Sequence, residues 1–329
     1  MNTEKYFKGK NILITGGTGS FGHQIVLELV KFHPKKIVVF SNDEKQHYDM
    51  QNEFKEYSEL LEFVMGDVRE YPRIYEAMKG VNVVYHAAAL KHVPMTEFHP
   101  FEAVKTNIVG AENVRRAAIE NKVDVVVAIS TDKAVKPVNV MGMTKAIQER
   151  IMLNPANERW PTKFVCVRYG NVIGSRGSVI PFFKNRIEKG KFLPITSFEM
   201  TRFLLRLQEA MELVFKATIE GETGQLFIKK MSACRVIDLA KAMAMAITKK
   251  ADYPIKETGI RPGEKIHEIL VSEEEMRRAI ETEENYVIYP YGRLEKPRLI
   301  RDLKEYTSNN TKILNEEEIT SLLRTEKWI

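Results

Sequence analysis

Asp132 and Lys133 are adjacent residues whose side-chain types could do acid and base chemistry. They lie in Ser130-Thr131-Asp132-Lys133, directly after an apolar run that predicts a strand over 124–130. The carboxyl ends of strands in open α/β sheets are where substrates bind. A carboxyl group can give a proton and an amine can take one, if the first is protonated and the second is neutral. A close ion pair opposes both states, so we expect a dry pocket to raise the pKa of Asp132 and lower that of Lys133.

A glycine-rich loop near the start of the chain has the pattern of a diphosphate site. It follows a predicted strand over 10–15 and precedes a helical pattern over 21–32. Glycine allows the tight turn and the close approach of a diphosphate, and a helix N-terminus offers free N–H groups. The residues that we expect to contact a dinucleotide here are Gly16, Thr18, Gly19, Ser20, Phe21 and Gly22.

The end of the second predicted strand, at 36–40, indicates which dinucleotide binds. Ser41, Asn42 and Lys45 favour NADP, because small polar and basic groups suit a 2′-phosphate. Asp43 and Glu44 lie close by and would either bind a ribose, which favours NAD, or cap the next helix. The cofactor is therefore predicted to be NADP.

Later strand ends add further candidate contacts with the cofactor. Asp67, in Gly66-Asp67-Val68, is placed to accept a hydrogen bond from an adenine amino group. Ala87, Ala88 and Ala89 follow the fourth predicted strand, and their small side chains leave room for the cofactor.

The elements that must position these residues alternate along the first half of the chain. Strand patterns at 10–15, 36–40, 61–65, 81–86, 124–130 and 163–169 are separated by helical patterns at 21–32, 43–57, 71–78, 100–121 and 141–153. This alternation predicts an α/β fold with a Rossmann-type doubly wound parallel sheet. We expect a Rossmann domain at 1–170 with a return segment at about 203–230, and a smaller interleaved α/β substrate domain at 171–202 and 231–329.

The second half is less regular. Helical patterns at 180–189, 207–218, 236–247 and 273–280 are joined by shorter extended pieces, notably 225–229. Within the last helix, Glu273-Glu274-Glu275 is expected to form a solvated face.

Composition excludes several classes of protein. The 329 residues are 44% hydrophobic and carry a formal net charge of +6 that is dispersed along the chain, which disfavours a nucleic-acid binder. No apolar run is long enough for a membrane helix and the first residues are polar, so we expect a cytoplasmic protein that does not bind a membrane. Cys166 and Cys234 are expected to be buried free thiols, and no metal site is expected.

Taken together, these motifs resemble the extended short-chain dehydrogenase/reductase family, and within it the soluble 4,6-dehydratases that act on UDP-N-acetylglucosamine. The resemblance covers nearly the whole chain. Besides the residues above, the resemblance rests on Ala88-Ala89-Leu90-Lys91-His92-Val93-Pro94, Arg168 to Pro181, Met200-Thr201-Arg202-Phe203 and Arg261-Pro262-Gly263-Glu264-Lys265. It implies NADP that is tightly bound and recycled in each turnover, and a homo-oligomer, either a dimer or a hexamer.

The resemblance also implies roles for individual residues. The cofactor takes hydride from C4 of the sugar, a base removes the C5 proton, an acid protonates the departing C6 hydroxyl, and the hydride returns to C6. Asp132 would be the acid and Lys133 the base, with Thr131 bonded to the C4 oxygen. Related deoxysugar dehydratases have Asp-Glu where this chain has Asp132-Lys133.

Met141 departs from the family pattern. Short-chain dehydrogenases carry Tyr four residues before the Lys, and here Met141 stands four residues before Lys145. A thioether cannot take a proton. The C4 hydroxyl proton would then pass to Lys133, Asp132, Thr131 or water, while Lys145 holds the nicotinamide ribose.

The remaining contacts that the resemblance implies concern both ligands. Lys91 and Asn107 would lie at the cofactor, Lys91 also near the sugar. The residues that would surround the UDP-sugar are Lys91, Asn171, Val179, Pro181, Arg202, Arg261 and Glu264.

We therefore predict a UDP-N-acetylglucosamine 4,6-dehydratase that inverts C5. Two alternatives stay open. A UDP-sugar 4-epimerase needs the same cofactor but expels no water, and the Asp132-Lys133 pair argues against it. A catalytically inactive NADP-binding scaffold is the second, since Met141 replaces the usual base.

Overall fold

The fold is seen in a computed structural model that describes residues 3–175, 177–292 and 303–329. A nine-stranded sheet forms its centre, in the order β14-β15-β10-β6-β5-β4-β1-β2-β3. Strands β3 to β10 in this order are parallel, whereas β15 and β14 pair antiparallel at one edge. The strands are β1 (Asn11–Thr15), β2 (Lys36–Ser41), β3 (Leu61–Met65), β4 (Val83–His86), β5 (Val125–Ile129), β6 (Lys163–Arg168), β10 (Leu226–Lys229), β14 (Ala279–Glu281) and β15 (Asn285–Ile288).

These segments form strands because their side chains are apolar on both faces. Ile12, Leu13 and Ile14 of β1 are fully buried, as are all five residues of 125–129 in β5. Helices cover both faces of a parallel sheet, so its central strands have no solvated side. The predicted doubly wound sheet is confirmed.

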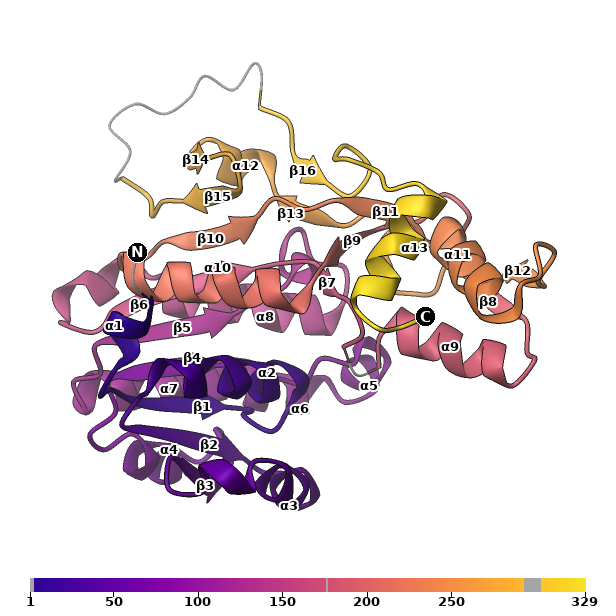
Figure 1. The fold of residues 1–329 in the computed structure, drawn as a ribbon. Coiled ribbons are helices and arrows are strands. Elements are labelled where there is room, and N and C mark those ends of the chain that lie inside the picture. The colour runs from indigo at the N-terminus through magenta and orange to yellow at the C-terminus, as the bar shows by residue number, and fades with distance from the viewer. Residues whose placement is uncertain (1–2, 176, 293–302) are drawn as a thin grey trace.

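Two layers of helices enclose the sheet (Figure 1). Helices α1, α2 and α10 pack together on one face, and α4, α7 and α8 pack together on the other. The helices of this part are α1 (Thr3–Phe7), α2 (Ser20–Leu29), α3 (Glu44–Glu53), α4 (Tyr71–Ala77), α5 (Val93–Phe98), α6 (Pro100–Ala103), α7 (Gly110–Glu120), α8 (Val140–Met152) and α10 (Leu207–Glu220), with short turns η1 (Val30–Phe32), η2 (Lys55–Tyr57), η4 (Asp132–Ala134) and η5 (Pro155–Arg159).

The helix predicted over 100–121 is continuous but contains one wider turn. Residues Val104–Val109 form the π-helical segment η3 between α6 and α7. Such turns shift the side chains that follow and recur at functional sites. Here the turn carries Thr106 and the buried Asn107, which both lie beside the loop after β4.

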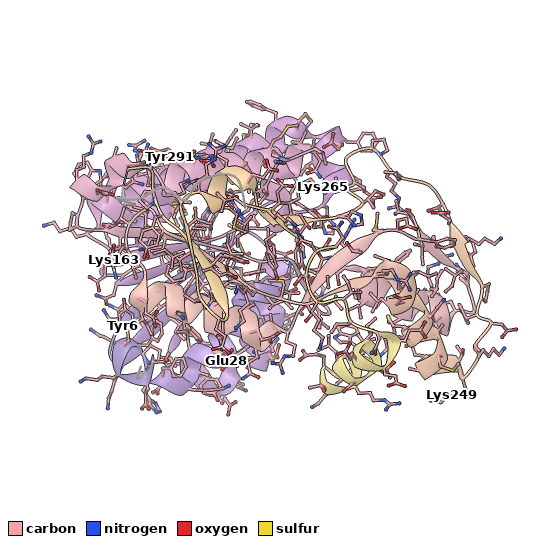
Figure 2. The ribbon with its side chains drawn as sticks, turned by 90° about the horizontal axis from the view of Figure 1, so that it is seen from above. Tyr6, Glu28, Lys163, Lys249, Lys265 and Tyr291 are labelled. Atoms are coloured by element: carbon pink, nitrogen blue, oxygen red, sulfur yellow. The ribbon has the colours of Figure 1, made fainter. Side chains whose placement is uncertain are left out.

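A smaller part of the chain has its own core. Its elements are β7 (Asn171–Val172), α9 (Val179–Glu188), β8 (Leu193–Ile195), β9 (Thr201–Leu205), β11 (Ala233–Arg235), α11 (Val236–Thr248), β12 (Ile255–Glu257) and α13 (Glu316–Thr325), while β13 (Ile269–Val271), α12 (Glu273–Met276) and β16 (Tyr306–Thr307) pack against the main core. Phe183, Leu239 and Leu323, from α9, α11 and α13, are buried together. Seen from above in Figure 2, Lys249 at the end of α11 marks this part, and Tyr6 and Lys163 lie at the opposite end of the molecule.

The two parts are interleaved along the sequence. After β9 the chain returns to the central sheet as α10 and β10, and β10 pairs with β6. It comes back a third time as β14 and β15, from within residues 231–329. None of the helices in the described residues has the length and apolar character that a membrane span requires.

One helix prediction is wrong. The pattern at 273–280 predicts a single helix, but α12 ends at Met276 and Ala279–Glu281 forms strand β14. The charged residues Arg277 and Arg278 follow the helix end, and pairing with β15 supplies backbone hydrogen bonds that a helix would otherwise provide.

Candidate active site

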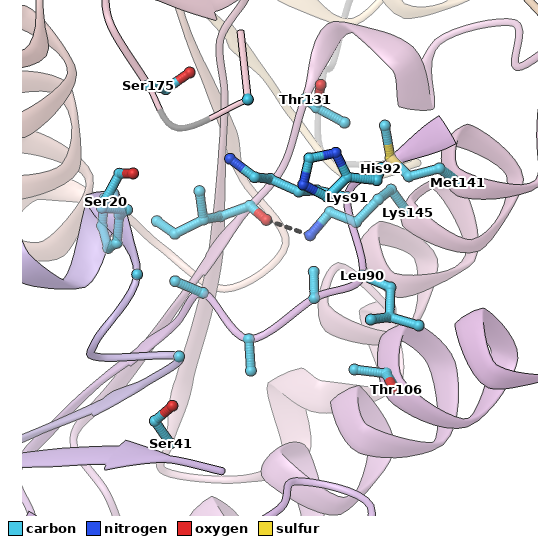
Figure 3. A pocket seen from close by; sticks show the side chains of 18 of the residues that line it. Ser20, Ser41, Leu90, Lys91, His92, Thr106, Thr131, Met141, Lys145 and Ser175 are labelled. Atoms are coloured by element: carbon cyan, nitrogen blue, oxygen red, sulfur yellow. Dashed lines mark hydrogen bonds between the residues drawn. The ribbon is translucent and has the colours of Figure 1, made fainter. Parts of the chain in front are cut away.

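A cavity of about 1000 Å³ opens at the carboxyl ends of the parallel strands. The loops after β1 to β6 all contribute to its wall, as expected for an open α/β sheet. The predicted residues that line it are Gly16, Thr18, Gly19, Ser20, Phe21, Ser41, Asn42, Asp67, Val68, Ala87, Ala88, Ala89, Lys91, Thr131, Asp132, Lys133, Met141, Lys145 and Asn171. Residues predicted from distant segments therefore meet in one place, and Figure 3 shows several of them.

The glycine loop forms a tight cradle at one end of this cavity. Gly16 has a φ of +64°, and a Cβ built there would lie 2.9 Å from the backbone of Ala88. Gly19 is the N-cap of the ten-residue helix α2 and has no side chain that could bond to its first N–H groups. A helix N-terminus with a glycine cap beside side-chain-free backbone suits a diphosphate. Gly22 does not line the cavity, because it packs against Gly17.

The end of β2 forms the next section of the wall. Thr18 Oγ1 donates to Ser41 Oγ at 2.8 Å, and Asn42 Nδ2 donates to Asp67 Oδ2 at 3.1 Å. Asp43 is the N-cap of α3, where its carboxylate accepts from the Gln46 backbone N–H at 2.9 Å. The carboxylate that would favour NAD is therefore engaged as a helix cap. Lys45 lies outside the cavity and pairs with Asp49.

Arg69 also lines this end of the cavity and was not predicted from the sequence. Its guanidinium lies 2.6 Å from Asp67 Oδ2 and 2.8 Å from Glu102 Oε2. Burial alone would raise the pKa of Asp67, but the hydrogen bonds from Arg69 and Asn42 lower it overall. No motif marks Arg69, which merely stands two residues after Asp67.

The loop after β4 is held by a residue that stands behind the wall. Asn107 accepts from the Leu90 backbone N–H at 2.8 Å and donates to the Leu90 carbonyl at 3.0 Å and to Thr144 Oγ1 at 2.9 Å. It is fully buried and does not line the cavity, so it acts through the loop that carries Lys91.

Asp132 and Lys133 lie together at the far end of the wall. Asp132 is 1% exposed, its Oδ1 accepts from Thr131 Oγ1 at 2.9 Å, and its Oδ2 has no hydrogen-bond partner. Lys133 Nζ lies 3.0 Å from Asp132 Oδ1. A buried carboxylate oxygen without a partner is costly unless a ligand or water supplies one.

The expected direction of the Lys133 pKa is wrong. Burial lowers the pKa of this amine, but the negative charges of Asp132 and Glu268 outweigh burial and raise it overall. Glu268 Oε1 lies 3.4 Å from Lys133 Nζ, and Glu268, unlike Asp132, does not line the cavity. In the sequence nothing marks Glu268, except that it stands three residues after Lys265, the last residue of the motif that begins at Arg261.

The environment of Lys145 lowers the pKa of its amine, whereas that of Lys133 raises it. Its Nζ donates to the Ile129 carbonyl at 2.6 Å, drawn as the dashed line in Figure 3, and to Gln148 Oε1 at 2.8 Å. Burial among neutral acceptors lowers its pKa to about 8. Met141 lies one helical turn earlier on α8, is 5% exposed and lines the cavity.

Several residues expected around a nucleotide sugar do not line the cavity: Val179, Pro181, Arg202, Arg261 and Glu264. Arg202 donates to the carbonyls of Thr201, Lys265 and Ile266 at 2.7–3.1 Å. Glu264 Oε2 accepts from Thr196 Oγ1 at 3.1 Å. Arg202 and Glu264 thus hold the 261–268 segment against β9 and Thr196.

The acidic run at 273–275 is not a solvated face throughout. Glu275 is buried, caps α12 through Ser272, and pairs with the fully buried Arg168 at 2.8 Å. Arg168 also pairs with Glu149 of α8 at 2.6 Å. The Ser272-x-x-Glu275 capping box was a readable signal for this helix start, whereas the partner Arg168 is too distant in sequence to be read.

The two thiols are free and buried, as predicted. Burial raises the pKa of Cys234 to about 12, so it is not a nucleophile. Across 3–175, 177–292 and 303–329, no group of His, Cys, Asp and Glu side chains is arranged to hold a metal ion.

A sequence model of the family described as "Polysaccharide biosynthesis protein" matches residues 12–290. The chain belongs to this family. The match spans both the glycine loop and the Asp132–Lys133 pair, so the cavity lies within the part that the family shares.

Curated relatives match this chain over nearly its full length. A protein of Rickettsia conorii named UDP-glucose 4-epimerase is 45% identical over 98% of this chain and 98% of its own. A protein of Methanocaldococcus jannaschii named "Uncharacterized membrane protein MJ1061" is 42% identical over 97% of this chain and 96% of its own.

Solved structures share the fold. Pen from Bacillus thuringiensis superposes with a TM-score of 0.92 at 35% identity, covering 98% of this chain and 99% of that one. DesIV from Streptomyces venezuelae, a dTDP-glucose 4,6-dehydratase solved with NAD and TYD, gives a TM-score of 0.71 at 17% identity over 97% of this chain and 96% of its own. At that identity the second likeness supports the fold alone.

Proposed function

We propose that this protein is an NADP-dependent UDP-N-acetylglucosamine 4,6-dehydratase that inverts C5. The observation that carries the proposal is the buried Asp132 carboxyl in the wall of the cavity, whose Oδ1 pairs with Lys133 and whose Oδ2 has no hydrogen-bond partner. Removing water from a sugar needs an acid and a base in one place, which this pair supplies. Membership in a polysaccharide biosynthesis family and relatives named UDP-glucose 4-epimerase support the substrate class.

The glycine cradle fits a dinucleotide, since its backbone lies open beside a helix N-terminus with a glycine cap. A nicotinamide bound there would supply hydride acceptance at C4 and hydride return at C6. Lys145 is placed to hold the nicotinamide ribose, and Asp67 the adenine. We infer NADP because the Asp43 carboxylate, although it lines the cavity, is engaged by Gln46 as a helix cap, while Ser41, Asn42 and Arg69 line the same end.

A route for the C4 hydroxyl proton follows from the contact of Thr131 with Asp132. Met141 cannot take a proton, and burial raises the pKa of Tyr169, which also lines the cavity. Thr131 Oγ1 donates to Asp132 Oδ1, so we infer that the C4 hydroxyl proton passes through Thr131 to Asp132.

The same proton then leaves with the C6 hydroxyl. Lys133 takes the C5 proton in its neutral form, which its raised pKa makes the minor form in the free enzyme. The C6–O bond breaks, and Asp132 gives its proton to the departing oxygen, so that one water forms. Lys133 then returns a proton to C5 on the face that inverts it. Each residue ends in the protonation state in which it began, as a catalytic cycle requires.

The alternative is a UDP-sugar 4-epimerase, favoured by the 45% identity to relatives of that name. An epimerase removes and returns hydride at C4 alone and needs no acid at C6. The buried Asp132 carboxyl would then have no role in the reaction.

Proton NMR of the purified protein with UDP-N-acetylglucosamine in D₂O, without added cofactor, separates the two. A C6 methyl signal with deuterium at C5 supports dehydration, and the coupling pattern reports inversion. A product changed only at C4 would establish epimerisation, and an unchanged sugar would exclude both for this substrate.

A further inference from the structure

Lys133 lies between two buried carboxylates, only one of which belongs to the cavity wall. Its Nζ is 3.0 Å from Asp132 Oδ1 and 3.4 Å from Glu268 Oε1. The side chain of Glu268 is 3% exposed and does not line the cavity, whereas Asp132 does. Glu268 therefore supports the amine from behind.

Asp132 cannot hold Lys133 throughout the proposed reaction. When Asp132 carries the proton that it will give to the C6 hydroxyl, it is neutral and its ion pair with Lys133 is lost. The Lys133 amine, which sits on a flexible four-carbon side chain, would then be free to move away from C5 of the sugar, whose proton it must take. A second carboxylate behind it removes that freedom.

Glu268 is itself fixed by contacts with the smaller part. Arg202 Nε of β9 lies 3.6 Å from the same Oε1, and the Glu268 backbone N–H donates to Ser308 Oγ at 2.9 Å. Ser308 in turn donates its backbone N–H to the Glu268 carbonyl at 2.8 Å. Arg202 thus contacts the carboxylate that faces Lys133, and Ser308 fixes the backbone that carries it, although neither residue lines the cavity.

The geometry points to Glu268 as a positioning residue that keeps Lys133 aligned while Asp132 changes its protonation state. This inference rests on the proposed dehydration. The two carboxylates then have different roles. Asp132 exchanges protons with the substrate, and Glu268 stays ionised and remains the partner of the Lys133 amine.

Charged groups from each neighbouring element act on Lys133. Asp132 of η4 and Glu268 favour its protonated form, and Arg202 of β9 opposes it. Lys265, whose Nζ contacts the Val135 carbonyl, adds further positive charge nearby. Replacing Glu268 by a neutral amide should lower the pKa of Lys133, since a nearby opposite charge typically shifts a pKa by about 1–3 units.

The test uses Glu268→Gln, the conservative Glu268→Asp and a matched control, Glu305→Gln. Glu305 also lies in the C-terminal segment and pairs with a lysine, but with Lys136 rather than Lys133. Competitive acetylation followed by peptide mass spectrometry gives the pKa of Lys133 without any turnover. The pH profile of deuterium incorporation at C5 of UDP-N-acetylglucosamine gives the functional counterpart.

We expect Glu268→Gln to lower the Lys133 pKa by about one unit and to move the acidic limb of the C5 profile to lower pH by a similar amount. Glu268→Asp should restore most of both, and Glu305→Gln should leave both as in the wild type. A Glu268→Gln variant that loses rate with an unchanged Lys133 pKa and pH limb would overturn the inference and leave Glu268 a purely structural residue.

Failure of the proposed function would be recognised separately. If the wild type forms no C6 methyl product, dehydration is wrong, but the acetylation measurement still tests the contact with Glu268. If the methyl product forms and the Lys133 pKa does not respond to Glu268→Gln, only the positioning role fails. Thermal melts of all three variants check that each is folded.

Discussion

The guanidinium of Arg168 at the end of β6 lies 2.8 Å from Glu275 at the start of α12, although 107 positions separate them in the chain. The same guanidinium contacts Glu149 of α8, the helix that also carries Met141 and Lys145. The Glu149 carboxylate also accepts from Ser130, next to Thr131. This buried cluster therefore connects α12 to the end of β5, which leads into Thr131 and Asp132, and to helix α8 of the site.

Glu275→Gln should lower the free energy of unfolding by about 2 kcal/mol at pH 7, because it breaks one of the two buried ion pairs of Arg168 and leaves the guanidinium paired with Glu149 alone. The loss should be measurable by urea denaturation. Glu273→Gln, on the same short helix but exposed, should change it by less than about 0.5 kcal/mol.

The contribution of Glu275 should also depend on pH. Burial would raise the pKa of this carboxyl, but Arg168 and the Ser272 hydrogen bonds hold it at about 2, below its ordinary 4.5. A lowered carboxyl pKa stabilises the fold above the unfolded value and loses that effect as pH falls through the folded value. The difference between wild type and Glu275→Gln should therefore shrink from pH 5 to pH 2. An equal difference at both ends would contradict the ion pair.

Asp132→Asn should abolish formation of the C6 methyl product, with a loss of about 10²–10⁴-fold, because an amide has no proton to give to the leaving hydroxyl. Cofactor retention, measured by absorbance of the purified protein, should be unchanged. Substantial remaining dehydration would show that another group is the acid.

Lys145 and Lys133 should titrate far apart although both line one cavity. Burial among neutral acceptors lowers the pKa of Lys145 to about 8, while two carboxylates raise that of Lys133. Competitive acetylation across pH 6–11 should label Lys145 at lower pH than Lys133. The reverse order would contradict the ion pairs described for Lys133.

Gly16→Ala should release the cofactor and destabilise the fold. Gly16 has a positive φ, and a Cβ would lie 2.9 Å from the backbone of Ala88. Gly9→Ala is a matched control, because Gly9 has a φ of +74° with no atom within 4 Å. Both should lose about 1 kcal/mol from backbone strain, and only Gly16→Ala should lose more and also lose the cofactor. Equal effects would mean that the close approach to Ala88 is unimportant.

Met141→Leu should keep activity within about threefold, since the swap preserves volume and removes only a sulfur that cannot carry a proton. The rate of C6 methyl formation is the measurement. A loss of 100-fold or more would show that the thioether itself takes part.

Much of this site was readable from sequence because local patterns dictate it. The glycines of the first loop and the strand ends at Asp67, Ala87 and Asp132 follow from periodicity and from the rule that such ends meet at one edge of a parallel sheet. Those residues do line one cavity.

The features of the site that could not be predicted from the sequence depend on contacts between distant segments. The pKa of Lys133 is raised by the adjacent Asp132 and, in addition, by Glu268, which lies 135 positions later, and the burial of Glu275 depends on Arg168. Arg202 looked like a diphosphate ligand by its type, yet its guanidinium is used by three backbone carbonyls. Charge alone does not reveal which partner a side chain will find.

The repeated returns of the chain to the central sheet limit how such a protein can diversify. Because β10, β14 and β15 of that sheet are separated in sequence by elements of the smaller part, no single cut separates one part from the other. Recombination that exchanges one terminal segment of the chain could therefore not replace the smaller part and so change the substrate preference. A new preference would have to arise by point changes and by insertions within the connecting loops.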